Sequence, residues 1–156
     1  MIFVTAGTQS SFDRLIEMID HLSPMLNEEI IAQCIESKYK AKNIKTIGLV
    51  NPDEFNRIFS KARVIIAHAG MGTIISALSS NKPIIVVPRI ASFGEHRDDH
   101  QISTAMQLNE LGFVYVAYDK KQLTDLLNNI DKLSVLKTIG GKAAQDLIDD
   151  IIGFIK

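Results

Sequence analysis

The stretch VIIAHAGMGTIISAL, residues 64–78, joins a β-branched apolar run to a helix through a turn that contains two glycines. The run at 64–69 is almost entirely apolar, which is typical of a strand covered on both faces of a parallel sheet. The small and apolar residues IISALSS that follow predict a helix. A strand, a glycine turn and a helix in this order form the unit from which α/β domains are built.

Further runs of the same kind are separated by amphipathic segments and predict strands at 2–6, 30–35, 45–50, 84–88 and 114–118. Helices are expected in the segments between them. Alternation of apolar strands with helices predicts an α/β class with a doubly wound, mainly parallel sheet. The 156 residues fit one domain, and we expect residues 1–156 to form it.

Helix boundaries can also be read from the sequence. Asn51-Pro52-Asp53-Glu54 supplies an N-cap, a proline at the first helical position and an acid at the third, and apolar residues 55, 58, 59 and 62 follow on one face. A later helix is expected to stop at Gly112. Gly140-Gly141 sets apart a last amphipathic helix over 140–156.

Composition limits the function classes. The formal net charge is −1, and the lysines at 38, 40, 42 and 45 form one local patch, which argues against nucleic acid as a ligand. The single cysteine, Cys34, can form no internal disulfide. No apolar run approaches the roughly 20 residues that cross a bilayer, and the N-terminus lacks the features of a signal peptide. We therefore expect a cytoplasmic protein whose membrane contacts are peripheral.

Ligands of such sheets bind beyond the carboxyl ends of the strands, so the loops that leave the strands are the candidate site. The first loop, TAGTQSS at 5–11, carries hydroxyls and an amide near a helix start, where free N–H groups attract anions such as phosphate. Its alternative role is structural, with Ser10 or Ser11 capping the helix. The loop lacks G-x-G-x-x-G and a Walker lysine, which disfavours dinucleotides and P-loop nucleotide binding.

The second loop is His68-Ala69-Gly70-Met71-Gly72-Thr73. Its glycines allow a close approach of the backbone to a ligand, and Thr73 adds a hydroxyl and a helix-start N–H. A histidine at a strand end is more often a structural hydrogen-bonding residue than a catalytic one.

The third loop follows the strand at 84–88 and contains GEHRDDHQ at 94–101. Its histidines and acids, with His68, are metal-ligand types, but adjacent residues at a helix entry diverge and no H-E-x-x-H face is present. Asp98 could instead cap the helix in a capping box with Gln101. Carboxylates, histidine and glutamine also suit neutral sugar hydroxyls, so we interpret the segment as a sugar-recognition loop.

In combination, MIFVTAGTQSSFDRLI, ARVIIAHAGMGTIISAL and KPIIVVPR with GEHRDDHQ resemble the C-terminal domain of family 28 glycosyltransferases. The chain is most similar to the short single-domain bacterial polysaccharide glycosyltransferases and to the catalytic subunit of the two-subunit N-acetylglucosaminyltransferase of lipid-linked oligosaccharide synthesis. The resemblance covers residues 1 to about 118. It implies the Rossmann-like, donor-binding C-terminal half of a GT-B enzyme, which uses a UDP-sugar as donor substrate and neither a metal nor another cofactor.

The resemblance also assigns roles to particular residues. It implies binding of the nucleotide and its diphosphate by Gly7, Thr8, Gln9, Gly70, Met71, Gly72, Thr73 and Ser76. It implies binding of the sugar by Arg89, Glu95, Asp99, His100 and Gln101. The candidates for catalysis are His68, which is expected beside the diphosphate, and Glu95. Many relatives have a ribose-binding glutamate at the position of Ser76, and a serine offers no charge-assisted bond there.

The same resemblance implies the partners. A GT-B enzyme binds its acceptor on a separate N-terminal half, so the expected function is hexosyl transfer from a UDP-sugar to a lipid-linked acceptor in surface polysaccharide synthesis. A membrane-anchored subunit would bind the acceptor and bring this chain to the membrane, and the apolar stripe of the last helix would contact that subunit or support a homodimer. Two alternatives are a non-catalytic nucleotide-sugar-binding subunit and a metal-dependent Rossmann-like hydrolase.

Overall fold

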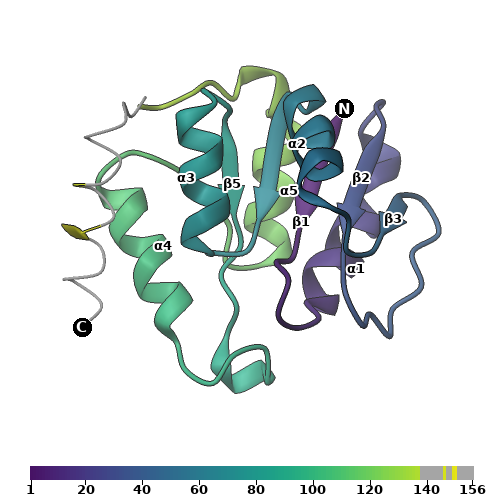
Figure 1. Cartoon of the computed structure of the whole chain (residues 1–156), viewed down its shortest axis with the longest axis horizontal. Helices are drawn as coiled ribbons and strands as arrows, with labels where there is room; N and C mark the ends of the chain where they lie inside the picture. The colour runs from purple at the N-terminus through teal and green to yellow at the C-terminus, as the bar shows by residue number, and fades with distance from the viewer. Residues whose placement is uncertain (138–145, 147–148, 151–156) are drawn as a thin grey trace.

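A six-stranded parallel sheet forms the centre of the molecule (Figure 1). The structure is a computed structural model that describes residues 1–137, 146, 149 and 150. The strand order is β3-β2-β1-β4-β5-β6. The chain adds strands outward from β1 to β3 on one side, then returns to the centre at β4 and adds strands outward to β6 on the other side, so the strand order reverses between β1 and β4. The strands are β1 (Ile2–Thr5), β2 (Ile30–Gln33), β3 (Lys45–Ile47), β4 (Val64–Ala67), β5 (Ile84–Val86) and β6 (Tyr115–Val116).

All six predicted strands are confirmed, and each ends before the apolar run does. The run at 64–69, for example, leaves the sheet after Ala67, so His68 and Ala69 already belong to the loop. The β1, β2, β4 and β5 side chains are buried on both faces of the sheet, which explains why these runs show no alternation of polar and apolar residues.

Helices cover the sheet on both faces (Figure 1). One face packs against α1 (Asp13–Leu22) and α5 (Lys120–Asn128) through leucines and isoleucines such as Leu15 and Leu123. The opposite face packs against α2 (Pro52–Lys61), α3 (Met71–Ser79) and α4 (His100–Glu110). Short 3₁₀ turns are η1 (Ser23–Met25), η2 (Ala91–Phe93) and η3 (Ile130–Lys132). Among the described residues, no helix is long and apolar enough to cross a membrane.

The predicted start of α2 is confirmed. The Asn51 side chain accepts a hydrogen bond from the Glu54 N–H at 2.9 Å, with Pro52 at the first helical position. On the inner face of the helix, Phe59 lies edge-on to Phe3 of β1. The predicted end of α4 is also confirmed, since Leu111 is its C-cap and Gly112 follows.

Two details of the prediction are wrong. No helix joins β2 to β3; residues 34–44 form a loop, because buried Asp20 of α1 accepts hydrogen bonds from the Tyr39 hydroxyl and from the N–H groups of Lys42 and Asn43. Neither Ser10 nor Ser11 caps α1, whose N-cap is Phe12 without a side-chain cap bond. Most of the helix predicted at 140–156 lies outside the described residues.

Candidate functional site

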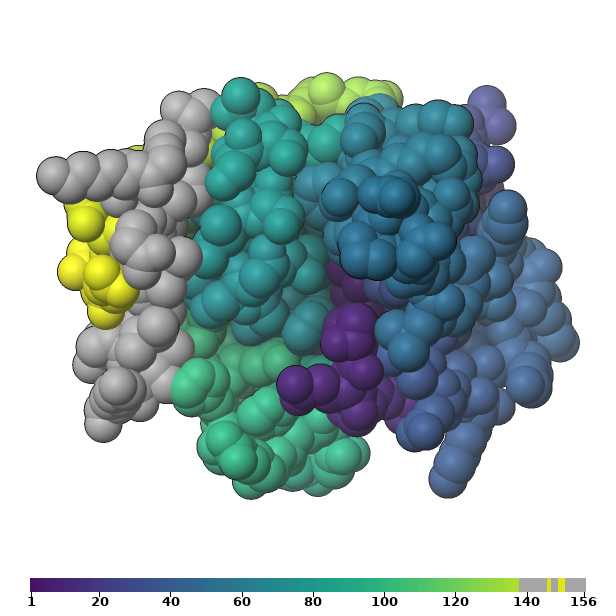
Figure 2. All heavy atoms as spheres, viewed as in Figure 1, coloured from purple at the N-terminus to yellow at the C-terminus, as the bar shows by residue number. Residues whose placement is uncertain are grey.

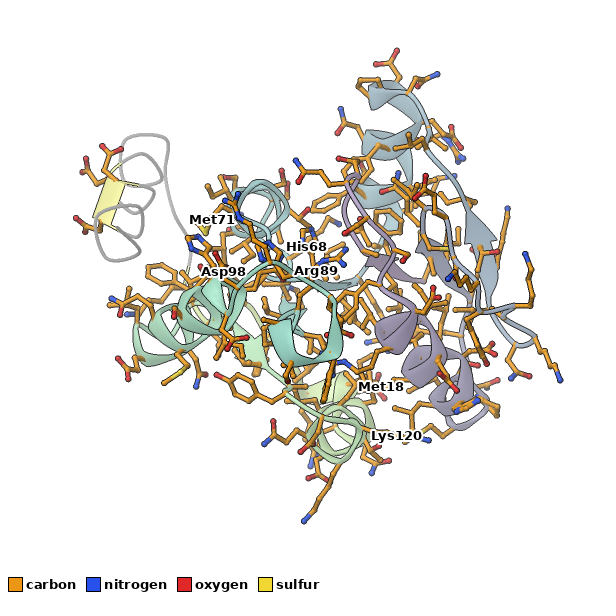
Figure 3. All side chains as sticks on the ribbon, turned by 90° about the horizontal axis from the view of Figure 1, so that it is seen from below. Met18, His68, Met71, Arg89, Asp98 and Lys120 are labelled. Atoms are coloured by element: carbon orange, nitrogen blue, oxygen red, sulfur yellow. The ribbon has the colours of Figure 1, made fainter. Side chains whose placement is uncertain are left out.

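A cavity of about 450 Å³ opens at the carboxyl edge of the sheet, where the loops after β1 and β4 diverge from the point at which the strand order reverses. This is the position where open α/β sheets bind ligands. In Figure 2 the N-terminal loop, in purple, reaches the surface where α2, α3 and the green segment after β5 meet. Figure 3 looks onto this edge: His68, Arg89 and Met71 lie near one another, whereas Met18 and Lys120 lie on the side of α1 and α5.

The loop after β1 forms one wall of the cavity. Gly7, Thr8 and Gln9 line it, and the side chains of Thr8 and Gln9 are exposed. Gly7 has a φ of +82°, a conformation that residues with a side chain rarely adopt. The loop therefore turns sharply at Gly7 and leaves Thr8 and Gln9 available to a ligand.

Arg89 holds this loop in place from below. Its buried guanidinium donates hydrogen bonds to the carbonyls of Ala6, Ser10, Ser11 and Glu95 at 2.6, 2.9, 2.6 and 3.3 Å and lies over the Phe12 ring. Burial lowers the pKa of Arg89 from its ordinary value, but an arginine stays protonated in proteins. The cavity is thus lined by a permanent positive charge, while the N–H groups of that guanidinium donate to backbone carbonyls.

His68 lies between the first two loops. A Cβ added at Gly7 would be 2.7 Å from His68 Nε2, and one added at Gly70 would overlap the same ring, so both positions require glycine to admit the imidazole. Burial, together with the charges of Arg89 and His96, lowers the pKa of His68 to about 4. The imidazole is therefore neutral at pH 7.

Helix α3 begins inside the cavity. Its N-cap is Gly70, and no side chain caps the first turn. Met71, Gly72 and Thr73 line the cavity and occupy the first three helical positions, whose N–H groups have no intrahelical acceptor. A Cβ at Gly72 would meet nothing within 4 Å, so this glycine faces open space. The first turn of α3 is an electropositive wall with free donors.

Gln101 connects the second and third loops. Its buried side-chain oxygen accepts from the N–H groups of Ala69 and Arg89 at 3.1 and 3.0 Å, and its side-chain nitrogen lies 3.2 Å from His68 Nδ1. The predicted capping box is wrong, because the Gln101 amide is used for these bonds. Asp98 instead accepts from the His100 N–H at 3.0 Å, and the N-cap of α4 is Asp99.

Most of the predicted site residues meet at the cavity, but Ser76, Glu95 and Asp99 do not line it. The Ser76 hydroxyl donates to the Gly72 carbonyl one turn earlier in α3. Both carboxylate oxygens of Glu95 are bound by Arg14, and one also accepts from the Ile90 N–H. Asp99 is exposed and accepts from the Ala91 N–H at 2.9 Å. These three side chains thus shape the loops around the cavity.

Three residues of the cavity lie outside the loops predicted from the sequence: Gln33, Phe55 and Thr104. Five more lie within those loops but were given no ligand contact there: Thr5, Ala6, Ser10, Ala69 and His96. Gln33, a polar residue at the end of an otherwise apolar strand, offered a detectable signal; its side-chain oxygen accepts from the Thr5 hydroxyl at 3.1 Å. Phe55 was interpreted as a core residue and offered none. Within the described residues, no three side chains of His, Cys, Asp or Glu are grouped so that they could hold a metal ion.

Comparison with known proteins gives related sequences. A curated relative, the UDP-N-acetylglucosamine transferase subunit ALG13 of Candida albicans, is 31% identical over 93 residues, which are 60% of this chain and 30% of that protein. A second, from Lachnoclostridium phytofermentans, is the UDP-N-acetylglucosamine–N-acetylmuramyl-(pentapeptide) pyrophosphoryl-undecaprenol N-acetylglucosamine transferase, 25% identical over 99% of this chain and 46% of its own length. The chain thus spans less than half the length of each.

Solved structures share the fold. The NMR structure of ALG13 superposes with a TM-score of 0.64 at 20% identity, over 94% of this chain and 93% of the other. MurG of Acinetobacter baumannii superposes with a TM-score of 0.63 at 18% identity, over 97% of this chain and 49% of MurG. The Rossmann-like α/β fold expected from the sequence, one half of a GT-B enzyme, is confirmed by these neighbours.

The family is shown by a match that covers nearly the whole chain. The family model of the glycosyltransferase family 28 C-terminal domain matches residues 1–146, which include every loop of the cavity. This chain therefore belongs to the glycosyltransferase family 28 C-terminal domain family.

Proposed function

We propose that this chain is the donor-binding and catalytic subunit of a glycosyltransferase that moves a hexosyl group from a UDP-sugar to a lipid-linked saccharide acceptor in surface polysaccharide synthesis. The observation that carries the proposal is the cavity at the reversal of the strand order, which combines two glycine loops, an uncapped helix start and a neutral histidine. Each of these features suits a diphosphate ester.

The diphosphate would lie between Gly7–Gln9 and the first turn of α3. There it could accept hydrogen bonds from the N–H groups of Met71, Gly72 and Thr73, with the Arg89 charge beneath it. Negative charge on the diphosphate grows as the sugar carbon leaves it, so fixed donors at this place stabilise the transition state more than the ground state. This stabilisation requires neither a cofactor nor a metal, and the UDP-sugar is the only small molecule involved.

The donor sugar would extend toward the start of α4. His96 and His100 line that end of the cavity and can bond neutral hydroxyls, while Asp99 lies next to them outside the lining. Glu95 is held by Arg14 and would contribute by fixing the loop, and not as a base. The acceptor would approach from the open side of the cavity.

The names of the relatives support the donor and the partner. Both of the curated relatives described above are named as transferases of N-acetylglucosamine from its UDP form, so UDP-N-acetylglucosamine is the first donor to test. ALG13 is named as a subunit, and the name of the bacterial relative includes an undecaprenol-linked substrate. We propose accordingly that a membrane-anchored subunit binds the lipid-linked acceptor and holds this chain at the cytoplasmic face of the membrane.

Two other functions make different predictions. A non-catalytic nucleotide-sugar-binding subunit would bind the donor and transfer nothing, even beside its partner. A metal-dependent hydrolase would lose its activity to a chelator, and the described residues contain no cluster of metal-ligating side chains that favours it.

The proposal is tested by calorimetry with UDP, UDP-N-acetylglucosamine and GDP-mannose, each with and without EDTA. We expect UDP and UDP-N-acetylglucosamine each to bind with the same affinity in the presence and in the absence of EDTA. At a ligand concentration of roughly 100 times Kd, they should stabilise the fold by about 2.7 kcal/mol. Strict dependence on a divalent metal, or preference for the guanosine ligand, would contradict the proposal.

A further inference from the structure

The Gln101 amide has only one orientation that its neighbours allow. The backbone N–H groups of Ala69 and Arg89 both point at the same side-chain atom, at 3.1 and 3.0 Å. An N–H group needs an acceptor, and an amide NH₂ cannot accept, so that atom is the oxygen. The side chain is buried, and turning it over would leave two backbone donors facing an NH₂ group.

This orientation sets the protons of His68. With the oxygen fixed, the Gln101 NH₂ group lies 3.2 Å from His68 Nδ1 and must donate to it. Nδ1 therefore holds a lone pair, and in a neutral imidazole the hydrogen is then on Nε2. The lowered pKa of His68, caused by burial and by the charges of Arg89 and His96, agrees with a neutral ring.

The hydrogen on Nε2 is directed at the cavity. His68 lines the cavity, and Nε2 is the ring nitrogen nearest to the positions that a Cβ would take at Gly7 and Gly70, at 2.7 and 2.6 Å, two residues that also line the cavity. Among the described residues, no fully buried side-chain nitrogen or oxygen lacks a hydrogen-bond partner, so Nε2, which bonds no protein atom there, reaches solvent. It can donate to an anion in the cavity, and it presents no lone pair that could take a proton from an acceptor.

We propose that Gln101 is a positioning residue that selects the Nε2–H tautomer of His68, so that this histidine acts as a neutral hydrogen-bond donor to the ligand oxygen in the cavity. The assignment of that oxygen to a diphosphate rests on the proposed function; the tautomer does not. The role differs from direct contact of Gln101 with sugar hydroxyls, because the amide oxygen is already used by two backbone donors.

The variant Gln101→Glu tests this by replacing the amide NH₂ group with an oxygen. A carboxylate can accept from both backbone N–H groups through one oxygen, and its other oxygen then requires a hydrogen on Nδ1. At pH 8 the ring should become the Nδ1–H tautomer, with a lone pair facing the cavity. At lower pH, the introduced carboxylate and His68 together take up one proton. If the carboxylate holds it, the acid donates to Nδ1 and the ring hydrogen is on Nε2; if His68 holds it, both ring nitrogens carry a hydrogen. In either case Nε2 is again a donor.

Two measurements follow. In ¹⁵N NMR of the unliganded protein at pH 8, we expect wild-type Nδ1 to resonate as an unprotonated nitrogen and Nε2 as a protonated one, with the two exchanged in Gln101→Glu. In calorimetry, the variant should bind UDP about tenfold or more weakly at pH 8, the cost of a lost bond to a charged group, and should recover toward pH 5.5. Wild type at the same pH is the reference for each comparison, because the terminal phosphate of UDP itself takes up a proton near a pH of about 6.

The matched control is Gln107→Glu, which makes the same change on α4 outside the cavity lining and should alter neither the spectrum nor the affinity. A wild-type spectrum with hydrogen on Nδ1 would overturn the inference, even if the variant fails to fold. UDP affinity equal to wild type at pH 8, or loss confined to UDP-sugars, would overturn the positioning role. The expected tautomers without any UDP binding by wild type would support the inference and contradict the proposed function.

Discussion

At the scale of single residues, the two glycines of the second loop have different physical roles. A side chain at Gly70 would overlap the His68 ring, whereas one at Gly72 meets nothing within 4 Å. The requirement for glycine at position 70 therefore comes from a neighbouring side chain. Sequence reasoning could not detect this difference, because both glycines were interpreted as room for a ligand.

We expect Gly70→Ala to cost about 1–3 kcal/mol of unfolding free energy, since the ring must move, and to weaken UDP binding. The matched variant Gly72→Ala should raise stability by up to about 1 kcal/mol, because alanine favours the helix. Urea denaturation and calorimetry on the two proteins measure both effects. Equal stability of the two variants would contradict the close approach of Gly70 to His68.

The lowered pKa of His68 predicts a pH dependence of stability. In the unfolded chain this histidine titrates near its ordinary value of 6.5, whereas in the fold its pKa is about 4. The unfolded state therefore binds more protons between these values, so unfolding free energy should fall as pH decreases from 6.5 to 4, by about 3 kcal/mol at most. Above pH 6.5 the contribution of His68 is fully present.

Urea titrations at pH 7 and pH 5 measure this slope, and His68→Gln should flatten it. Four carboxyls also have lowered pKa values, those of Asp20, Glu28, Glu54 and Asp98, and their ordinary values are 3.8 for aspartate and 4.5 for glutamate. Their stabilising effect is lost mainly below that window, so it is separable from the effect of His68. A slope unchanged by His68→Gln would show that other groups cause it.

At the scale of elements, the link between β2 and β3 depends on one carboxylate. Asp20 is 1% exposed, and the Tyr39 hydroxyl and the N–H groups of Lys42 and Asn43 donate to it at 2.6 to 3.1 Å. Burial opposes its ionisation, but these donors outweigh burial and lower its pKa. The helix-free loop 34–44 thus takes its shape from a residue of α1.

Asp20→Asn should lower the free energy of unfolding by about 2–4 kcal/mol, because the amide NH₂ cannot accept and would face backbone donors. Denaturant unfolding measures this change. The control is Asp125→Asn. The carboxylate of Asp125, in α5, makes no hydrogen bond in the described part of the chain. Hydrogen exchange should also accelerate at Lys42 and Asn43, and unchanged exchange there would contradict the role of Asp20.

What the sequence could predict at this scale follows from local rules. Apolar runs predicted the strands, and Asn51-Pro52 predicted the start of α2, because both signals are contained in a few adjacent residues. The contacts of Asp20, Arg89 and Gln101 could not be predicted in the same way. Each joins backbone groups that are brought together only by folding, such as Arg89 and the carbonyl of Ala6. Arg89 and Gln101, which the sequence predicted as sugar-binding residues, bind backbone groups of the loops around the cavity.

At the scale of the whole molecule, the proposed function predicts that donor binding and transfer are separable. The purified chain should bind a UDP-sugar but transfer it poorly or not at all to a lipid-linked acceptor. Co-expression with a membrane-anchored acceptor-binding subunit should restore transfer, which radiolabelled sugar incorporated into the lipid fraction would measure. The control is the same partner without this chain.

Full transfer activity of the isolated chain would contradict the need for a partner. A homodimer would then be the structure to test by sedimentation, with the apolar stripe predicted at 140–156 as its contact. Donor binding without transfer in the presence of the partner would favour the non-catalytic binding subunit.

The bonds of Arg89 and Gln101 have a consequence for the order of events during synthesis of the chain. The loop after β1 leaves the ribosome early, but the guanidinium that binds its carbonyls belongs to residue 89, and the amide that orients His68 belongs to residue 101. A nascent chain that has not yet exposed residue 101 has no complete cavity, however well its first strands have formed. Capture of ribosome-bound chains of increasing length on immobilised UDP should therefore not begin before the length at which α4 has emerged.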